Sequence, residues 1–366
     1  MTPLPPGLLR DELLGIEPYG APQLDVPVLL NVNENPYPPS PAVVADIERA
    51  VAEAARDLNR YPDREFVALR AALAAYLGHG LEPAQVWAAN GSNEVMLHVL
   101  QAFGGPGRLA LSFAPTYSMY PEYARDTHTA WLAGHREQDF SLDAAAAVEL
   151  VRERRPHVVL LPSPNNPTGT ALPHDVIGAL CKELDHGVLV VDEAYAEFRR
   201  AGTPSALELL PAHPNLVVTR TMSKAFALAG ARVGYLAGSA EICDALRVVR
   251  LPYHLSAVTQ AVACAALRHA EELLGAVDTL RGERDETVDW LRAQGFRVAD
   301  SDANFVLFGT FPDRHAVWQG ILDHGVLVRE TGPDGWLRVS IGTPSEMAAF
   351  RAALTSVTAD PREARA

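Results

Sequence analysis

Two hydrophobic patterns alternate along most of the chain. Apolar residues at spacings of three and four, such as Val43, Ile47 and Val51, predict helices, whereas short uninterrupted apolar runs predict buried strands. The runs expected to be strands are residues 86–89, 109–113, 129–132, 158–161, 188–191, 216–218 and 233–236. Short apolar strands between helices indicate an α/β fold with a mostly parallel central sheet flanked by helices.

Both ends of the chain depart from this alternation. Prolines in the first forty residues are too frequent for regular helix or central strand, which predicts an extended arm. After residue 250 a helical stretch runs from 256 to about 293, as one helix or as two that meet near Gly275. Shorter strand-like and helical segments follow. We expect an N-terminal arm (1–40) that belongs to a small α+β domain, a large domain (41–250) and the rest of the small domain (251–366).

Composition narrows the class of protein. The chain has 366 residues, of which 48% are hydrophobic, enough for a large buried core. The net charge of -14 argues against a nucleic-acid or anionic-membrane partner, because either would repel the chain. No apolar run reaches transmembrane length, no signal peptide is apparent, and the three cysteines form no C-x-x-C pair. A cytoplasmic protein without a metal site is expected.

Polar residues follow several of the expected strands. Ligands of open α/β sheets lie beyond the carboxyl ends of the strands, so these residues are the first candidates for a site. Asp192 follows four apolar residues, and its carboxylate needs a cationic or N–H partner there. Lys224 follows another apolar run among small and hydroxylic residues, where partial desolvation would lower its pKa and favour a nucleophilic amine. Taken alone, Lys224 is better explained as an exposed turn residue, because lysines are mostly exposed, and Asp192 as the N-cap of the segment that follows it.

An anion site is expected in the same region. The turn Gly91-Ser92-Asn93 lies between a strand and a helix, where free N–H groups and the helix dipole can bind a phosphate, although a simple helix cap also explains it. Arg232, eight residues after Lys224, can clamp a phosphate in bidentate fashion. An amine, a buried carboxylate, the turn amide of Asn166 and a phosphate site together are what pyridoxal phosphate requires.

Longer motifs connect these residues to a known family. They are residues 164–169 (PNNPTG), 191–195 (VDEAY), 221–226 (TMSKAF) and 230–234 (GARVG). The chain resembles the fold type I pyridoxal-phosphate aminotransferases from Tyr19 to about Thr343. Among them it is most similar to the histidinol-phosphate aminotransferases, on the motifs 33–37 (NENPY), 61–63 (YPD) and 336–343 (WLRVSIGT).

The resemblance implies a role for each candidate. Lys224 is expected to attach pyridoxal 5'-phosphate covalently and to move a proton between the substrate carbon and the cofactor. Asp192 is expected to pair with the ring nitrogen, and Asn166 and Tyr195 to bind the ring oxygen. Tyr117 is expected to stack on the ring. The expected phosphate ligands are Gly91, Ser92, Asn93, Thr221, Ser223, Arg232 and, across a homodimer interface, the partner subunit's Tyr61.

The resemblance also implies a reaction of histidine biosynthesis. L-histidinol phosphate and 2-oxoglutarate would give imidazole acetol phosphate and L-glutamate by ping-pong chemistry. One pocket must then accept a carboxylate or a phosphate, and a guanidinium binds both. Arg338 and Arg329 are the expected anion ligands, although a salt bridge to Glu330 or another acid is an alternative for Arg329. Tyr19 and Asn35 on the arm are expected near the substrate.

Other functions fit the sequence less well. An aromatic amino-acid aminotransferase or a threonine-phosphate decarboxylase of the same family would share the lysine, aspartate and arginine. A non-catalytic regulator of this fold usually carries a DNA-binding domain, which is not apparent. A dehydrogenase would need G-x-G-x-x-G after the first strand, and a metallohydrolase H-E-x-x-H; neither motif occurs. The turn reads Gly-Ser-Asn-Glu where the family commonly has Gly-Ala-Asp-Glu, which leaves the backbone donors unchanged.

Overall fold

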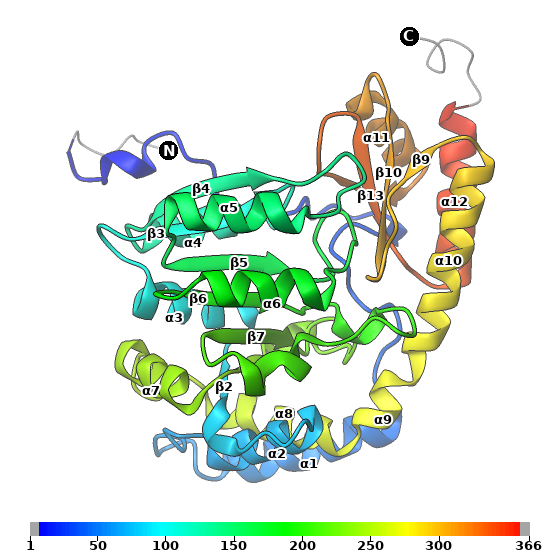
Figure 1. The fold of residues 1–366 in the computed structure, drawn as a ribbon. Helices are drawn as coiled ribbons and strands as arrows, with labels where there is room; N and C mark the ends of the chain where they lie inside the picture. Colours follow the sequence, from blue (N-terminus) through cyan, green and yellow to red (C-terminus); the bar gives the residue numbers. More distant parts are fainter. Residues whose placement is uncertain (1–6, 359–366) are drawn as a thin grey trace.

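A seven-stranded sheet forms the centre of the computed structural model, which describes residues 7–358 (Figure 1). Its strand order is β2-β8-β7-β6-β5-β3-β4. The bounds are β2 Val86–Ala89, β3 Leu109–Ala114, β4 Ala130–His135, β5 Val158–Pro162, β6 Val188–Asp192, β7 Leu216–Thr221 and β8 Gly234–Ala237. β3 to β7 pair in parallel, whereas β8 is antiparallel to both of its neighbours. The expected α/β fold with a mostly parallel sheet is confirmed.

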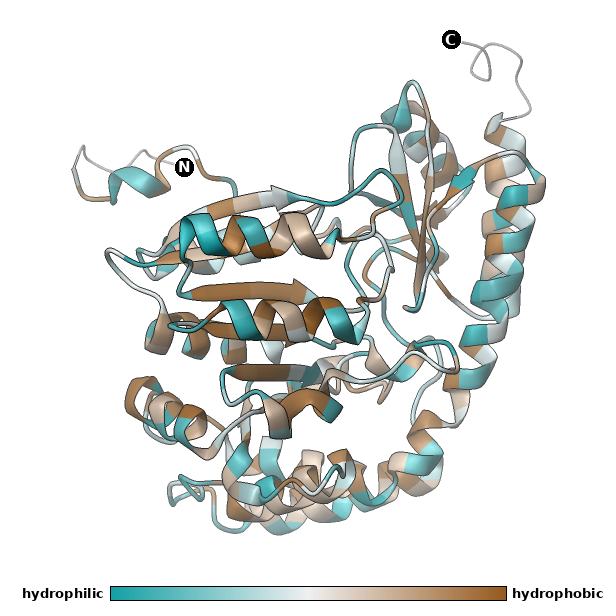
Figure 2. Ribbon diagram, viewed as in Figure 1, coloured by the Kyte–Doolittle hydropathy of each residue, from teal (hydrophilic) through white to brown (hydrophobic). Residues whose placement is uncertain are grey.

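Helices cover both faces of this sheet. They are α1 Pro41–Ala55, α2 Val67–Leu77, α3 Ser92–Phe103, α4 Tyr120–Asp126, α5 Ala144–Arg154, α6 His174–Glu183 and α7 Ala240–Val249. α5 and α6 lie on one face, and α3 on the other (Figure 1). The central strands β5 and β6 are apolar for most of their length (Figure 2), because side chains on both faces are buried.

Two of these helices differ from the pattern-based expectation. α5 was expected from residue 141, but it begins at Ala144 because the side chain of Asp143 accepts a hydrogen bond from the Ala146 N–H and so caps the helix. α7 was not expected at all. Ser239 caps it in the same way, and its buried side chains Ile242 and Leu246 pack in the core of the large sheet.

The helical stretch after residue 250 is broken. It consists of α8 Ala257–Arg268, α9 Ala270–Leu273, a 3₁₀ turn at Leu274–Ala276 and α10 Val277–Ala293, so the two-helix alternative is nearer to the structure. α8 packs against α1 and α2, and its buried Ala263 and Ala266 belong to the core of the large sheet. The domain boundary after residue 250 stays a prediction, but this packing favours a boundary closer to Val277.

A second, smaller sheet faces the carboxyl edge of the first. It is antiparallel, with the order β12-β13-β10-β9. Its elements are β9 Arg297–Val298, β10 Phe305–Gly309, β12 Arg329–Glu330 and β13 Trp336–Ser340, with α11 Arg314–Asp323, α12 Pro344–Thr358 and α10 around it. The long helix α10 runs from the 3₁₀ turn after α9 to this smaller unit, where it lies beside α12 (Figure 1).

The N-terminal arm joins the smaller unit. β1 Val28–Leu29 pairs in parallel with β11 Val326–Leu327, and a 3₁₀ turn at Asp11–Leu13 is the only regular element among residues 7–27 of the arm. The outer ends of the expected ranges 1–40 and 251–366 lie outside the described residues. Within residues 7–358 no helix is both long and apolar enough to cross a membrane.

Candidate active site

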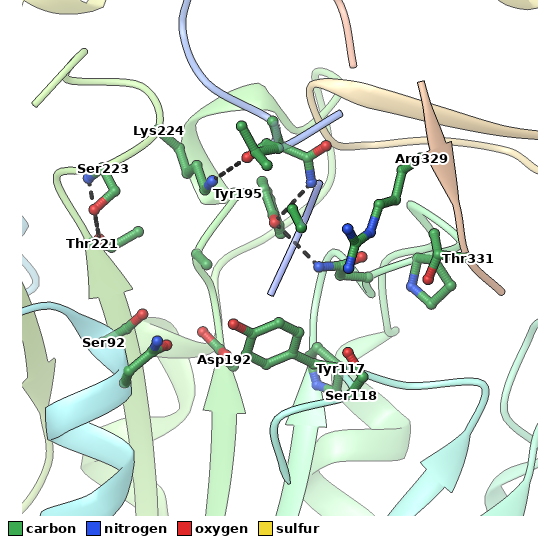
Figure 3. A pocket seen from close by; sticks show the side chains of 18 of the residues that line it. Ser92, Tyr117, Ser118, Asp192, Tyr195, Thr221, Ser223, Lys224, Arg329 and Thr331 are labelled. Atoms are coloured by element: carbon green, nitrogen blue, oxygen red, sulfur yellow. Dashed lines mark hydrogen bonds between the residues drawn. The ribbon is translucent and has the colours of Figure 1, made fainter. Parts of the chain in front are cut away.

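A cavity of about 260 Å³ lies where the carboxyl edge of the large sheet meets the arm and the small sheet (Figure 3). Thirteen of the residues predicted from the sequence line it. They are Tyr19, Ser92, Asn93, Tyr117, Asn166, Asp192, Tyr195, Thr221, Ser223, Lys224, Arg232, Arg329 and Arg338. Parallel strands end at one edge, so residues far apart in sequence meet there.

Asp192, the last residue of β6, is a buried carboxylate that faces the cavity. It accepts hydrogen bonds from the Tyr120 hydroxyl and the Thr219 hydroxyl, both at 3.1 Å. Burial raises the pKa of Asp192 to about 6, although these two hydrogen bonds act in the opposite direction. No cation pairs with it among residues 7–358, so a cationic ligand group would find its counterion here.

Lys224 stands opposite Asp192, in the loop after β7. Its Nζ donates to the backbone carbonyl of Val32 on the arm, at 2.8 Å. Burial lowers the pKa of Lys224 to about 8, and the positive charge of Arg338 adds to this effect. The amine is therefore partly neutral, and nucleophilic, at mildly alkaline pH.

Three elements form a cradle for an anion. The first N–H groups of α3, at Ser92 and Asn93, have no partner within the helix and face the cavity. Across from them Thr221 donates to Ser223 Oγ at 3.0 Å, and Arg232 Nη1 donates to the same oxygen at 3.2 Å. Arg232 forms no salt bridge within the described part of the chain, so its charge remains available to a ligand.

Two glycines allow these elements to approach one another. Gly91 has a φ of 88°, and a Cβ there would overlap the Arg232 guanidinium. A Cβ at Gly234, the first residue of β8, would overlap the backbone of Gly91 and Ser92. Gly91 itself does not line the cavity. It shapes the turn that brings Ser92 and Arg232 together.

Tyr195, Asn166 and Tyr117, which were expected to surround the cofactor ring, line the same cavity as Asp192 and Lys224. Tyr195 is buried, and its hydroxyl accepts hydrogen bonds from Asn33 Nδ2 at 3.0 Å and Asn166 Nδ2 at 3.4 Å. Burial raises the pKa of Tyr195 above its ordinary value. Tyr117 projects from the loop after β3 into the space beside Asp192 (Figure 3).

Two arginines face the cavity from the smaller sheet. Arg338 on β13 is buried, and it donates to Asn166 Oδ1 at 2.5 Å and to the Asn31 carbonyl at 2.8 Å. Its Nε is buried without a partner. Burial lowers the pKa of Arg338 to about 10, still well above neutrality. Neither it nor Arg329 forms a salt bridge to an acid among residues 7–358; Arg329 donates to the Gly20 carbonyl instead.

The alternative of a pair between Arg329 and Glu330 is wrong, because Glu330 pairs with Arg314 and His315 on α11. Two free cationic side chains in one cavity favour an anionic ligand. Tyr19 lies at the mouth of the same cavity, where its hydroxyl accepts from Ser118 Oγ at 3.3 Å.

Besides Gly91, two predicted residues lie outside the cavity of this single chain, Asn35 and Tyr61. Asn35 uses its amide inside the protein, donating to the Ala225 carbonyl at 3.1 Å and accepting from the Tyr37 N–H. It borders the loop of Lys224 rather than the space for a substrate. Tyr61 is 80% exposed and stacks on Tyr253, with ring centroids 4.4 Å apart. A role for Tyr61 in a site therefore requires another chain.

Three contacts were not expected from the sequence. Val32 accepts from Lys224, Asn33 donates to Tyr195, and Tyr120 donates to Asp192. Asn33 belongs to the motif 33–37, so the two asparagines of this proline-rich segment were the sequence feature that could have indicated its contact. Nothing in the local pattern marks Val32 or Tyr120, since one acts through its backbone and the other is an apolar-face residue of α4.

Comparison with known proteins identifies the family. The model of the family "Aminotransferase class I and II" matches residues 26–354. The chain belongs to this family. This aminotransferase is 66% identical over 350 residues to the histidinol-phosphate aminotransferase of Thermobifida fusca, covering 96% of the chain and 95% of that protein. It is 62% identical over 355 residues to histidinol-phosphate aminotransferase 3 of Burkholderia lata, with 96% of each covered.

Solved structures agree with the fold. The histidinol-phosphate aminotransferase of Sinorhizobium meliloti, in complex with pyridoxal-5'-phosphate, superposes with a TM-score of 0.81 at 26% identity, over 91% of this chain and 90% of that one. An aspartate aminotransferase of Thermus thermophilus gives 0.78 at 26% identity, over 94% and 97%. The fold is thus shared by aminotransferases of different names, and only the higher identities separate them.

The cavity of this aminotransferase fits pyridoxal phosphate. Asp192 is a buried carboxylate that lacks a cation, as a protonated ring nitrogen requires. Lys224 is an amine of lowered pKa, and the cradle of Ser92, Ser223 and Arg232 combines N–H, hydroxyl and guanidinium donors. The amine, the carboxylate and the donors of the cradle match, in that order, an aldehyde, a protonated pyridine nitrogen and a phosphate in one ligand.

Proposed function

We propose that this aminotransferase converts L-histidinol phosphate and 2-oxoglutarate to imidazole acetol phosphate and L-glutamate, with pyridoxal 5'-phosphate as its cofactor. One observation carries the proposal. Arg338, a buried guanidinium without an acidic partner in the described residues, faces the same cavity as Lys224 and Asp192. The named relatives at 66% and 62% identity support the same substrates.

Each side chain has a task in this reaction. When bound, the cofactor supplies an electron sink for the bond broken at the substrate carbon. Asp192 holds a negative charge against the ring nitrogen and so keeps it protonated. Lys224 Nζ would hold the cofactor and, once free, would move the proton from the substrate carbon to the cofactor, so that the amino group stays with the cofactor. Val32 can hold this amine by its carbonyl while it is free.

The anion pocket explains why two different substrates can use one site. Glutamate brings a carboxylate and histidinol phosphate brings a phosphate, and neither needs the other's group. The guanidinium of Arg338 donates in a fork that fits both anions, and Arg329 offers a second cation 9 residues earlier in the chain. Tyr117 and Tyr19 border the remaining space.

A substrate comparison tests the proposed function. Steady-state kcat/KM is measured for L-histidinol phosphate and for phenylalanine, each against 2-oxoglutarate, and threonine phosphate is assayed for release of CO₂. We expect histidinol phosphate to give the highest kcat/KM and threonine phosphate to release none. A higher kcat/KM for phenylalanine would assign the protein to the aromatic aminotransferases instead, and CO₂ release would assign it to the decarboxylases.

We further propose that the active unit is a homodimer of the cytoplasm in which Tyr61 serves the partner's phosphate site. Tyr61 stacks on Tyr253, and two large apolar side chains shortly before Tyr253 in the chain are exposed, Val248 at 83% and Leu251 at 75%. Exposed large apolar side chains of this kind are typical of an interface. The free cysteines Cys181 and Cys243 are buried and unpaired, which suits a reducing compartment.

Mixing two damaged variants tests the shared site. Tyr61→Ala and Lys224→Ala are purified separately, mixed, and allowed to exchange subunits. A mixed dimer then contains one site with both native residues, so activity should rise to as much as about a quarter of the wild-type value. Lys224→Ala mixed with Asp192→Ala is a matched control, because both residues belong to one chain's site and no intact site can form. No rise in the first mixture would refute the contribution of Tyr61 across the interface.

A further inference from the structure

Asn33 on the arm is buried between the two sheets, with 2% of its surface exposed. Its backbone N–H donates to Ser340 Oγ at 2.8 Å, and its carbonyl accepts from Asn304 Nδ2 at 3.1 Å. Its φ is 56°, a left-handed conformation that asparagine adopts more readily than most residues. The smaller sheet therefore holds the backbone of Asn33 on both sides.

The side chain of Asn33 faces the large sheet and has a defined direction. Ser340 Oγ donates to Asn33 Oδ1 at 2.9 Å, which leaves the amide nitrogen turned toward Tyr195. Asn33 Nδ2 donates to the Tyr195 hydroxyl at 3.0 Å. An amide nitrogen can only donate, so the tyrosine oxygen must accept this bond.

The direction of the Tyr195 proton follows from these bonds. A hydroxyl oxygen has two lone pairs and one proton. Asn33 occupies one lone pair, and Asn166 Nδ2 occupies the other at 3.4 Å. The remaining O–H is then free to donate, and Tyr195 lines the cavity. The two amides together direct this proton away from themselves and toward a ligand.

We propose that Asn33 is a positioning residue for Tyr195: it holds the hydroxyl so that its proton is donated to the ring oxygen of the bound cofactor. This proposal rests on the proposed function, because it needs pyridoxal phosphate in the cavity. Ser340, two residues from Arg338 on β13, holds Asn33 in turn. The strand that carries the substrate arginine thus also sets the hydrogen bond to the cofactor.

A double-mutant cycle tests this role by spectroscopy. Asn33→Gly removes the side chain and keeps the left-handed backbone without strain. The pH dependence of the bound cofactor's absorption is recorded for wild type, Asn33→Gly, Tyr195→Phe and the double variant. Loss of an oriented O–H donor destabilises the anionic form of the ring oxygen, so Asn33→Gly should raise the midpoint by about one pH unit. On the Tyr195→Phe background it should cause almost no further change.

Two further variants distinguish a specific effect on the Tyr195 hydroxyl from a general loss of protein stability. Asn33→Asp keeps the size of the side chain but has no N–H group, and its midpoint should move in the same direction. Asn215→Gly is the matched control, because Asn215 Nδ2 also makes two hydrogen bonds, to the carbonyls of Cys181 and Leu184 at the far end of the sheet. It should lower the melting temperature and leave the midpoint unchanged.

Each outcome has a separate meaning. Equal shifts of the midpoint on the wild-type and Tyr195→Phe backgrounds, or no shift on either, would overturn the role of Asn33. Transamination of histidinol phosphate is measured on the same wild-type sample. A protein that binds the cofactor without this activity would refute the proposed function alone, since the spectral cycle remains readable.

Discussion

Replacing Asp192 by asparagine should stabilise the cofactor-free protein while it weakens the cofactor site. The carboxylate is buried at the end of β6, with two hydroxyl donors and no cation among the described residues. Asparagine has nearly the same shape and no charge. The free protein therefore loses a poorly solvated anion, whereas the loaded protein loses the counterion of the ring nitrogen.

The size of the first effect follows from the pKa of Asp192. Burial raises it from an ordinary value of 3.8 to about 6 in the folded protein. The folded state therefore binds more protons than the unfolded state between these two values, so wild-type stability falls as pH rises through this window and is constant above it. The difference corresponds to about 3 kcal/mol at pH 8. At pH 5 about half of it remains, and below pH 4 almost none.

Urea unfolding of the cofactor-free proteins at pH 8 and pH 5 is the assay. Asp192→Asn should be more stable than wild type by up to about 3 kcal/mol at pH 8, and by about half as much at pH 5. Titration with pyridoxal phosphate should show the opposite order, with affinity lowered at least about tenfold in the variant. A variant less stable than wild type at pH 8, or a difference independent of pH, would refute the reasoning.

Glu193, the next residue, provides a control, because neutralising its carboxylate should lower the stability of the protein rather than raise it. Burial raises the pKa of its carboxyl, but the positive charges of Arg220 and Arg199 outweigh burial and hold it below the ordinary value. Arg220 Nη2 lies 2.7 Å from Glu193 Oε2. Glu193→Gln would remove the nearer of the two carboxylates that neutralise the buried Arg220 and leave only Glu197, 3.5 Å from Arg220 Nη1, so we expect a loss of stability of up to about 3–5 kcal/mol at pH 8.

Two further predictions concern the reaction. The rate at which the cofactor-free protein captures pyridoxal phosphate should rise with pH and level off, with a midpoint near pH 8, because burial lowers the pKa of Lys224 to about 8. Stopped-flow absorption measures this rate. A midpoint above pH 10 would contradict the role of Lys224 as the attacking amine. Arg338→Lys should lower kcat/KM by about 30-fold for both glutamate and histidinol phosphate, because one ammonium cannot keep the bonds to Asn166 and Asn31 and also grip an anion. Single-turnover half-reactions check it; slowing of only one of them would show that the substrates do not share this pocket.

Much of the large sheet was predictable from local pattern. Apolar runs marked the strands because side chains on both faces of a parallel sheet must be buried. Polar residues just after those runs then marked the site, since parallel strands end at one edge. Asp192, Asn166 and Lys224 were found in this way, and the structure brings them to one cavity. Helix α7 was missed although its cap Ser239 and apolar spacing are local features.

The sequence by itself determined the order along the chain of the strands and of most helices, the family, and the chemical groups that meet at the cavity, because each depends on short-range pattern or on motifs of a few residues. Only the tertiary structure decided which residues of the N-terminal arm contact the site. Asn33 contacts Tyr195 across 162 positions and Ser340 across 307, and no periodicity encodes such a contact.

The tertiary structure also decided the pKa values of the buried carboxylates. Asp192 and Glu193 are adjacent acids, yet the pKa of one is raised and that of the other lowered. The reason is that burial acts on both carboxylates, whereas Arg220 on β7 and Arg199 pair with Glu193 and not with Asp192.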